Sequence, residues 1–394
     1  MLTSIALIFI FGLLLGAIFQ RLKLPSLIGM ILVGILLGPY VFHILDESLL
    51  RISADIRQVA LVIILTRAGL SLDIGDLKKV GRPAILMCFV PACFEILGVI
   101  LIAPNVLGVT ILEAAIMGAV IAAVSPAVIV PRMLRMMEEG YGKEKGIPQL
   151  ILAGASVDDV FVIVLFTALT GFASGEQVSG NLFLQIPISI VLGIVLGIVC
   201  GAVFVQFFRW VHMRDSIKIL IVLSVSFLLL ELEQQLEGSV PISGLLAIMS
   251  MGMVINLRYK QLAKRLSLKY NKLWVAAEVL LFSLVGATVD LQYAREAGLA
   301  ALILVITALC VRMLGVFVCM IKTKLTWKET LFCMLAYTPK ATVQAAIGGI
   351  PLAMGLACGQ KVLTVAVLSI LITAPFGAFC VDQSYKKLLK KEES

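Results

Sequence analysis

The chain has 394 residues, of which 61% are hydrophobic and only 14% are charged, and its mean hydropathy is +1.09. This composition excludes a soluble globular domain, in which about a quarter of the residues are charged. The net charge of +8 is spread along the chain in short clusters, so it predicts no single basic patch for nucleic acid.

Apolar stretches recur from one end of the chain to the other, and each is long enough to cross about 30 Å of hydrocarbon as a helix. The first lacks a basic leader and runs into a second apolar stretch, so we expect it to be retained and not cleaved as a signal peptide. The predicted thirteen segments lie near residues 2–20, 25–44, 54–72, 83–104, 111–137, 148–172, 182–208, 216–236, 240–257, 271–291, 298–321, 327–352 and 361–382.

Basic residues alternate between the two ends of these segments. Loops and tails that follow odd-numbered segments hold 25 of the 32 Lys and Arg, including Lys78, Lys79 and a predicted loop from Arg258 to Lys272. Loops after even-numbered segments hold only Arg51, Arg57, Arg295 and Lys361. By the positive-inside rule, the N-terminus is predicted outside and the C-terminus in the cytoplasm, in a plasma (inner) membrane.

Two of the segments are predicted to be broken. The fifth reads IAAVSPAVIVP, with Pro126 and Pro131, and the twelfth reads AYTPKATVQAAIGGIP, with Pro339 and Pro351. Proline removes a backbone donor and clashes with the preceding turn, so both segments are predicted to unwind inside the membrane. If segments 1–6 and 8–13 are inverted repeats joined by segment 7, the broken helices are fifth in each, which is typical of a transporter's central site. The alternative is two simple proline kinks.

An adjacent pair of carboxylates, Asp158 and Asp159, lies inside the sixth segment, ILAGASVDDVFVIVLFTAL. One acidic residue at the bilayer centre costs about 2.5–3.5 kcal/mol even on lenient insertion scales, and like charges so close resist joint ionisation. Carboxylates can hold protons or a hard cation, so the pair predicts an ion-coupled transporter. The alternative is a pair that only packs two helices together.

Three basic residues, Arg67, Arg312 and Lys340, lie inside segments. Arg67 is near a segment end and is predicted to be structural, whereas Arg312 lies in the middle of ALILVITALCVRMLGVFVCM. Arginine stays protonated, so Arg312 needs a buried anion unless it snorkels to the surface. The candidate partners are Glu95 and the aspartate pair. No Cys or His spacing suggests a metal or a nucleophile, so neither an enzyme nor a cofactor is expected.

Several motifs carry a family resemblance: LPSLIGMILVGILLGP, LTRAGLSLD, VSPAVIVPRM, GYGKEKGIP, GASVDD and YTPKATVQAAIGG, in this order over nearly the whole chain. The sequence resembles the monovalent cation:proton antiporter superfamily, and more narrowly the NHA-type sodium/proton antiporters. The resemblance implies an all-α homodimer of thirteen-helix protomers. Each protomer would have a dimerisation subdomain (residues 1–82 and 216–297), a linker helix (182–210) and an ion-translocating core (83–175 and 298–384).

The resemblance also implies roles for single residues. The family's ion-binding aspartates correspond to Asp158 and Asp159, and the second is expected to be the principal cation ligand. The crossing, ion-coordinating backbone corresponds to Val124, Ser125, Pro126, Thr338 and Pro339. The core ion pair corresponds to Glu95 and Arg312.

One position departs from the family pattern. NHA-type relatives usually carry a glutamate where this chain has Thr288. How Lys340 is neutralised is therefore open. It is expected either to titrate during transport, or to offset half-helix dipoles or pair with Asp290.

The function that follows is exchange of Na⁺ or Li⁺ for H⁺, in which proton and cation compete for the aspartates and the core rocks between the two sides of the membrane. A K⁺/H⁺ antiporter is the nearest alternative. An ion-coupled organic-solute symporter is less favoured, because few aromatic residues are available to line a larger cavity.

Overall fold

The computed structural model describes residues 1–71, 81–173, 182–236, 240 and 242–391. Lys78 and Lys79, which we predicted in a loop, lie outside these residues. Within the described part, all regular structure is helical, apart from an isolated bridge between Tyr141 and Lys391. The chain divides into two compact units, residues 1–54, 73–166 and 279–394 in the first and residues 55–72 and 167–278 in the second.

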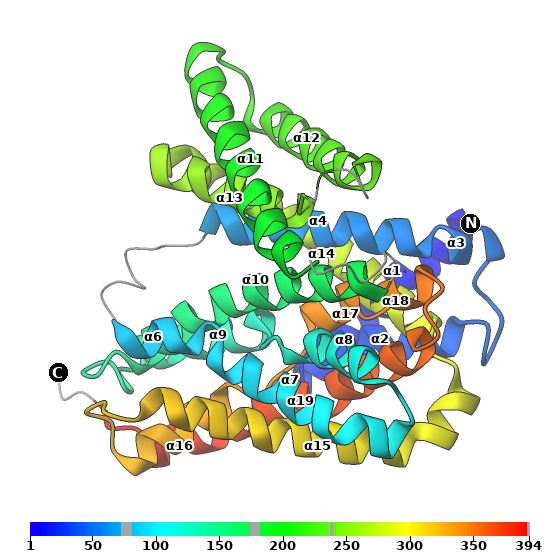
Figure 1. Cartoon of the computed structure of the whole chain (residues 1–394), viewed down its shortest axis with the longest axis vertical. Coiled ribbons are helices and arrows are strands. Elements are labelled where there is room, and N and C mark those ends of the chain that lie inside the picture. The colour runs from blue at the N-terminus through cyan, green and yellow to red at the C-terminus, as the bar shows by residue number, and fades with distance from the viewer. Residues whose placement is uncertain (72–80, 174–181, 237–239, 241, 392–394) are drawn as a thin grey trace. The chain divides into compact units, whose positions relative to one another are not determined.

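The first unit contains most of the helices (Figure 1). It comprises α1 (Leu2–Arg21), α2 (Ser26–Leu37), α3 (Glu47–Arg51), α6 (Arg82–Met87), α7 (Val90–Leu107), α8 (Ile111–Ala122), α9 (Pro126–Glu138), most of α10 (Ile147–Ala173), the end of α14 (Lys260–Ala287), α15 (Leu291–Met320), α16 (Trp327–Ala336), α17 (Thr342–Ile347), α18 (Ile350–Ala353) and α19 (Gly359–Leu388). The second unit holds most of α4 (Ser53–Ser71), the end of α10, α11 (Leu182–Trp210), α12 (Asp215–Gln235), α13 (Gly244–Arg258) and most of α14.

Eight of the described helical stretches are long and apolar enough to cross a membrane. They are Leu2–Arg21, Arg82–Leu107, Ile111–Glu138, Ile147–Ala173, Ile188–Trp210, Lys260–Ala287, Gly298–Met320 and Gly359–Leu388. Three shorter apolar stretches are Ser26–Leu37, Gly244–Arg258 and Thr342–Ala353. The predicted all-helical membrane class is therefore confirmed, whereas the count of thirteen spans stays a prediction.

One predicted boundary was wrong and another predicted segment is interrupted, both for local reasons. The second segment was expected to reach residue 44, but α2 ends at Leu37 because Gly38 adopts extended backbone. The fourth segment is interrupted after α6, and α7 begins afresh with Pro91 in its first turn, where its missing N–H costs no hydrogen bond.

The basic loop predicted from Arg258 to Lys272 is mostly helix. α13 ends at Arg258 and α14 begins at Lys260, so only Tyr259 separates them. Lysine and arginine are good helix formers, and here they occupy exposed positions while Leu262, Ala263 and Leu266 are fully buried. The charges therefore lie on one face of a helix.

Close helix packing in the first unit positions the residues discussed below. α7 and α15 lie side by side (Figure 1). A Cβ on Gly315 of α15 would lie 2.9 Å from the Cα of Pro91 on α7, so only glycine allows this approach. Similarly, a Cβ on Gly377 of α19 would lie 2.4 Å from the ring of Pro339. Both contacts bring segments distant in sequence close together, the first backbone to backbone and the second backbone to proline ring.

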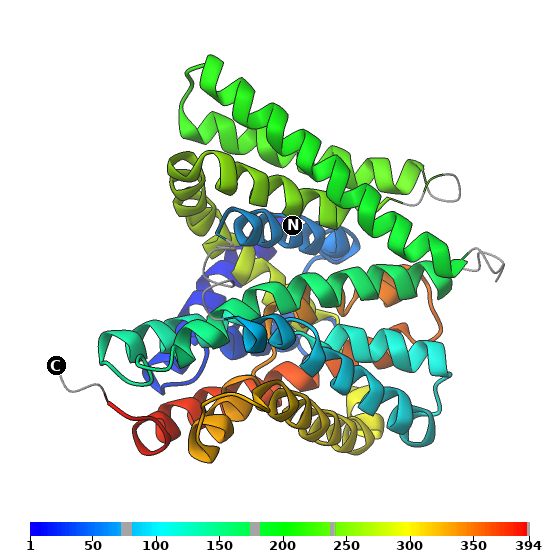
Figure 2. The same cartoon turned by 60° about the vertical axis from the view of Figure 1, so that its left-hand side comes forward.

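The second unit uses the same device. α11 lies along α13 (Figure 2). Gly193, Gly197 and Gly201 of α11 face α13, and a Cβ on Gly197 would lie 2.3 Å from a backbone oxygen of that helix. Small residues spaced by four thus form a flat stripe that lets two helices approach closely.

Candidate functional site

Two interrupted helices cross at the centre of the first unit. α8 ends at Ala122, and extended backbone at Ala123 and Ser125 leads into α9, which begins with Pro126. α16 ends at Ala336, and α17 begins at Thr342. The amide of Ser125 donates to the carbonyl oxygen of Pro339 at 2.8 Å, so the two unwound segments bind each other directly. The residues expected at a crossing, Val124 to Pro126 and Thr338 to Pro339, are therefore brought together.

Gln344 completes the crossing, and we did not predict this role. Its side-chain amide donates to the carbonyls of Ala123 at 2.8 Å and Ile121 at 3.3 Å, and its oxygen accepts from the amide of Ala341 at 2.8 Å. These bonds satisfy backbone groups that the unwound chain exposes, at a depth where unsatisfied groups are costly. The available signal was a Gln three residues into a helix that follows a proline break, a position from which it can cap the helix.

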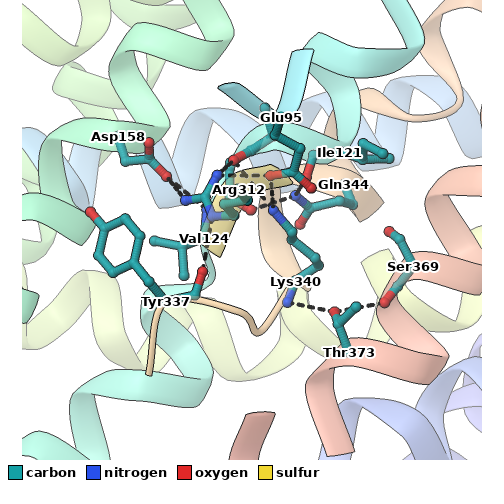
Figure 3. A network of polar contacts seen from close by, with 12 residues as sticks. Glu95, Ile121, Val124, Asp158, Arg312, Tyr337, Lys340, Gln344, Ser369 and Thr373 are labelled. Carbon is teal, nitrogen blue, oxygen red and sulfur yellow. Dashed lines mark hydrogen bonds and ion pairs between the residues drawn. The ribbon is translucent and has the colours of Figure 1, made fainter. Parts of the chain in front are cut away.

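Arg312 lies at the centre of a buried polar network (Figure 3). Its Nη1 lies 2.9 Å from Glu95 Oε2, and its Nη2 lies 2.8 Å from Asp158 Oδ2. Its Nε donates to the carbonyl oxygen of Tyr337 at 2.9 Å, and Nη1 also donates to the carbonyl of Ala122. One guanidinium therefore joins α7, α10, α15 and both broken helices. The sequence left open whether Arg312 pairs with Glu95 or with the aspartate pair, and in the structure it contacts both.

Lys340 shares the same glutamate. Its Nζ lies 2.5 Å from Glu95 Oε2 and 3.4 Å from the carbonyl oxygen of Ala122. Its backbone amide donates to Thr373 Oγ1 on α19 at 2.9 Å. Thr288 stands where relatives usually carry a glutamate, and its hydroxyl donates to the carbonyl of Val285 in the preceding turn. Glu95 thus supplies a carboxylate for Lys340.

The aspartates differ in their surroundings. Asp158 is fully buried, and its Oδ2 accepts from the amide of Val124 at 2.9 Å as well as from Arg312. Asp159 is partly buried. Three oxygen atoms here have no hydrogen-bond partner among the described residues: Oδ1 of Asp158, Oδ1 of Asp159 and Oγ of Ser125. They belong to adjacent or directly bonded segments, and all are donors of the kind that hard cations prefer.

Because Lys340 has a charged partner, its replacement should affect the stability of the protein more than the pH dependence of transport. Lys340→Gln is expected to lower the melting temperature by about 5 °C or more, since loss of a charged hydrogen bond costs about 1.5–3 kcal/mol. The pH dependence of transport should stay as in the wild type. Thermal unfolding and pH–rate profiles check this, with Lys361→Gln as a control, because its ammonium donates to two backbone carbonyls, those of Leu107 and Gly108. A shifted pH profile for Lys340→Gln alone would mean that this lysine titrates during transport.

Comparisons with known proteins agree with the fold. A family model described as sodium/hydrogen exchanger, transmembrane, matches residues 5–382. The chain is 33% identical over 389 residues to sodium/hydrogen exchanger 9B2 of Mus musculus, covering 94% of this chain and 69% of that protein. It is 32% identical over 397 residues to sodium/hydrogen exchanger 9B1 of Homo sapiens, covering 93% and 73%.

The fold is also similar to a solved structure. The sodium proton antiporter MjNhaP1 from Methanocaldococcus jannaschii superimposes with a TM-score of 0.86 at 21% identity, covering 98% of each chain. The family match spans nearly the whole sequence and includes both broken helices and the aspartate pair. This chain belongs to the sodium/hydrogen exchanger family of membrane transporters.

Proposed function

We propose that the chain exchanges Na⁺ or Li⁺ for H⁺, and that the transported ion binds at Asp159 beside the crossing of the two broken helices. The observation that carries the proposal is the set of oxygens on Asp158, Asp159 and Ser125 that have no hydrogen-bond partner within the described part of the chain. Unpaired polar atoms in a protein interior are rare and costly, and they mark places that bind something else. A partly dehydrated monovalent cation needs several such oxygens.

The charge of the cluster supports an exchange of one proton for one cation. Its carboxylates are Glu95, Asp158 and Asp159, and its cations are Arg312 and Lys340. Glu95 and Asp158 are in ion pairs with these two cations. Ionised Asp159 would leave one uncompensated negative charge, which one proton or one Na⁺ neutralises. Binding of one ion therefore requires release of the other.

Arg312, Glu95 and Lys340 hold the site in shape in this proposal and carry no transported proton. Arg312 contacts both broken helices through the carbonyls of Ala122 and Tyr337. Buried, paired charges of this kind resist rearrangement, because separating any pair leaves an unpaired charge in a low dielectric. They fix the carboxylate of Asp158 against the amide of Val124.

The architecture proposed around this site follows the family pattern. Thirteen spans in two inverted repeats would form a core from residues 83–175 and 298–384, a linker helix from 182–210 and a dimerisation subdomain from 1–82 and 216–297. Movement of the core against that subdomain would expose the site to each side of the membrane in turn. The distribution of Lys and Arg supports an outside N-terminus and a cytoplasmic C-terminus in the cell membrane.

Transport by the purified protein in liposomes tests the proposal. With a pH-sensitive dye inside, an outward Na⁺ gradient should drive protons inward, and so should Li⁺. The rate should not change when valinomycin and K⁺ clamp the membrane potential, because one charge moves each way. Equal rates with K⁺ would assign the chain as a K⁺/H⁺ antiporter, and rates that follow the potential would refute one-for-one exchange.

A further inference from the structure

A cavity of about 390 Å³ lies in the second unit, whereas the residues of the polar network belong to the first. The end of α11, the link to α12, the first turn of α12 and the junction of α13 with α14 form its walls. Its volume is within the range of about 300–1,000 Å³ that is typical of small-molecule sites. No part of the proposed exchange uses this cavity.

Positive charge dominates the cavity wall. Arg209, Arg214, Lys218 and Arg265 line it, with Asp215 as its carboxylate. Asp215 Oδ2 lies 3.0 Å from Arg265 Nε, and Oδ1 lies 3.6 Å from Lys218 Nζ. One carboxylate is therefore shared between two cations, and the other two cations are not neutralised within the wall. His212 also lines the cavity.

Two of these cations are held in place before any ligand binds. The guanidinium of Arg209 lies 5.6 Å from the ring centroid of Tyr259 and donates to the carbonyl oxygen of Arg258 at 3.1 Å. Lys218 is buried, and its ammonium lies 5.5 Å from the ring centroid of Phe208. Fixed cations lose little side-chain entropy on binding an anion, so they favour affinity.

We propose that this cavity binds the phosphate group of a phosphate ester. A phosphate monoester carries up to two negative charges and several acceptor oxygens, which match the excess cations and the fork of an arginine. The site repels Na⁺ and the other transported cations. Trp210, at the end of α11, is 76% exposed, and Val199 and Val203 of the same helix are also exposed. Exposed tryptophan at the end of an apolar helix is typical of the depth of lipid headgroups.

The phosphate can come from a lipid headgroup or from a soluble ester, and the two sources can be separated. The full-length chain is placed in phosphatidylcholine nanodiscs, and its melting temperature is measured while phosphatidic acid is added to the discs or glycerol 3-phosphate to the buffer. A rise with phosphatidic acid alone assigns a lipid. A rise with both assigns the phosphate group itself.

A matched pair of variants locates the effect. Arg214→Gln removes an exposed cation from the cavity wall, whereas Lys264→Gln removes an exposed cation from α14 outside the wall. Arg214→Gln should raise the half-saturating concentration of the phosphate probe about tenfold, since a charged hydrogen bond contributes about that factor or more to affinity. Lys264→Gln should leave it unchanged. No stabilisation by either probe, or an equal rise of the half-saturating concentration in both variants, would overturn the proposal.

Discussion

Asp159→Asn is expected to abolish cation-dependent proton movement while the protein still folds and inserts into the membrane. Asparagine has nearly the same size, but it carries no charge and cannot alternate between a proton and a cation. Asp159 Oδ1 forms no hydrogen bond with the described residues, so the substitution breaks no hydrogen bond of that atom. The exchange rate in liposomes should fall to that of protein-free liposomes, and the melting temperature should stay equal or rise.

The matched control is Asp46→Asn. Asp46 is exposed and caps α3 through the amide of Ser48 at 2.8 Å. The substitution makes the same chemical change in the same unit at a residue that bonds Met1, Ser4 and Ser48, which are not part of the polar network, so exchange should continue at the wild-type rate. Wild-type exchange in Asp159→Asn would show that the ion binds elsewhere.

The second large effect is expected on stability, at Glu95 and Arg312. With Asp159 protonated, the network is neutral. Glu95→Gln leaves one excess positive charge, Arg312→Met leaves one excess negative charge, and the double variant is neutral again. Breaking a buried pair from one side typically costs about 3–5 kcal/mol. The double variant should therefore cost less than the sum of the two single variants.

Thermal unfolding of the four proteins measures this coupling, and a second cycle provides the control. Arg132 and Asp382 form a pair at 3.2 Å, with side chains 18% and 35% exposed. A pair that solvent reaches is worth about 0–1 kcal/mol, so its coupling should be small. If the losses at Glu95 and Arg312 are additive, so that their coupling is no larger than that of the control cycle, a shared buried network is contradicted.

Much of the site could be predicted because membrane burial makes certain residues conspicuous. Pro126 and Pro339 inside apolar runs indicated the two breaks, and an arginine at mid-segment indicated a buried anion. These inferences need only the local sequence and the cost of polar groups in hydrocarbon. The predicted start of α14 was wrong for a related reason: a run of charges does not distinguish a loop from an exposed helix face.

The contacts themselves could not be predicted from local sequence. Arg312 has five donors, and only the fold decides that they reach Glu95, Asp158 and two backbone carbonyls. The bond from Gln344 to Ala123 joins residues 221 positions apart. The partner of Lys340 was uncertain because the family's usual acid is absent at Thr288, and its neutralisation by Glu95 depends on how α7 packs against the second broken helix.

The dependence of Na⁺ affinity on pH tests the central claim most directly. If one proton and one Na⁺ compete for Asp159, the half-saturating Na⁺ concentration for exchange should rise about tenfold for each unit of pH lost in the acid range, because the ligand must be deprotonated to bind the cation. The maximal rate at saturating Na⁺ should stay constant. A half-saturating concentration that does not change with pH, while the maximal rate falls, would contradict competition at a shared site.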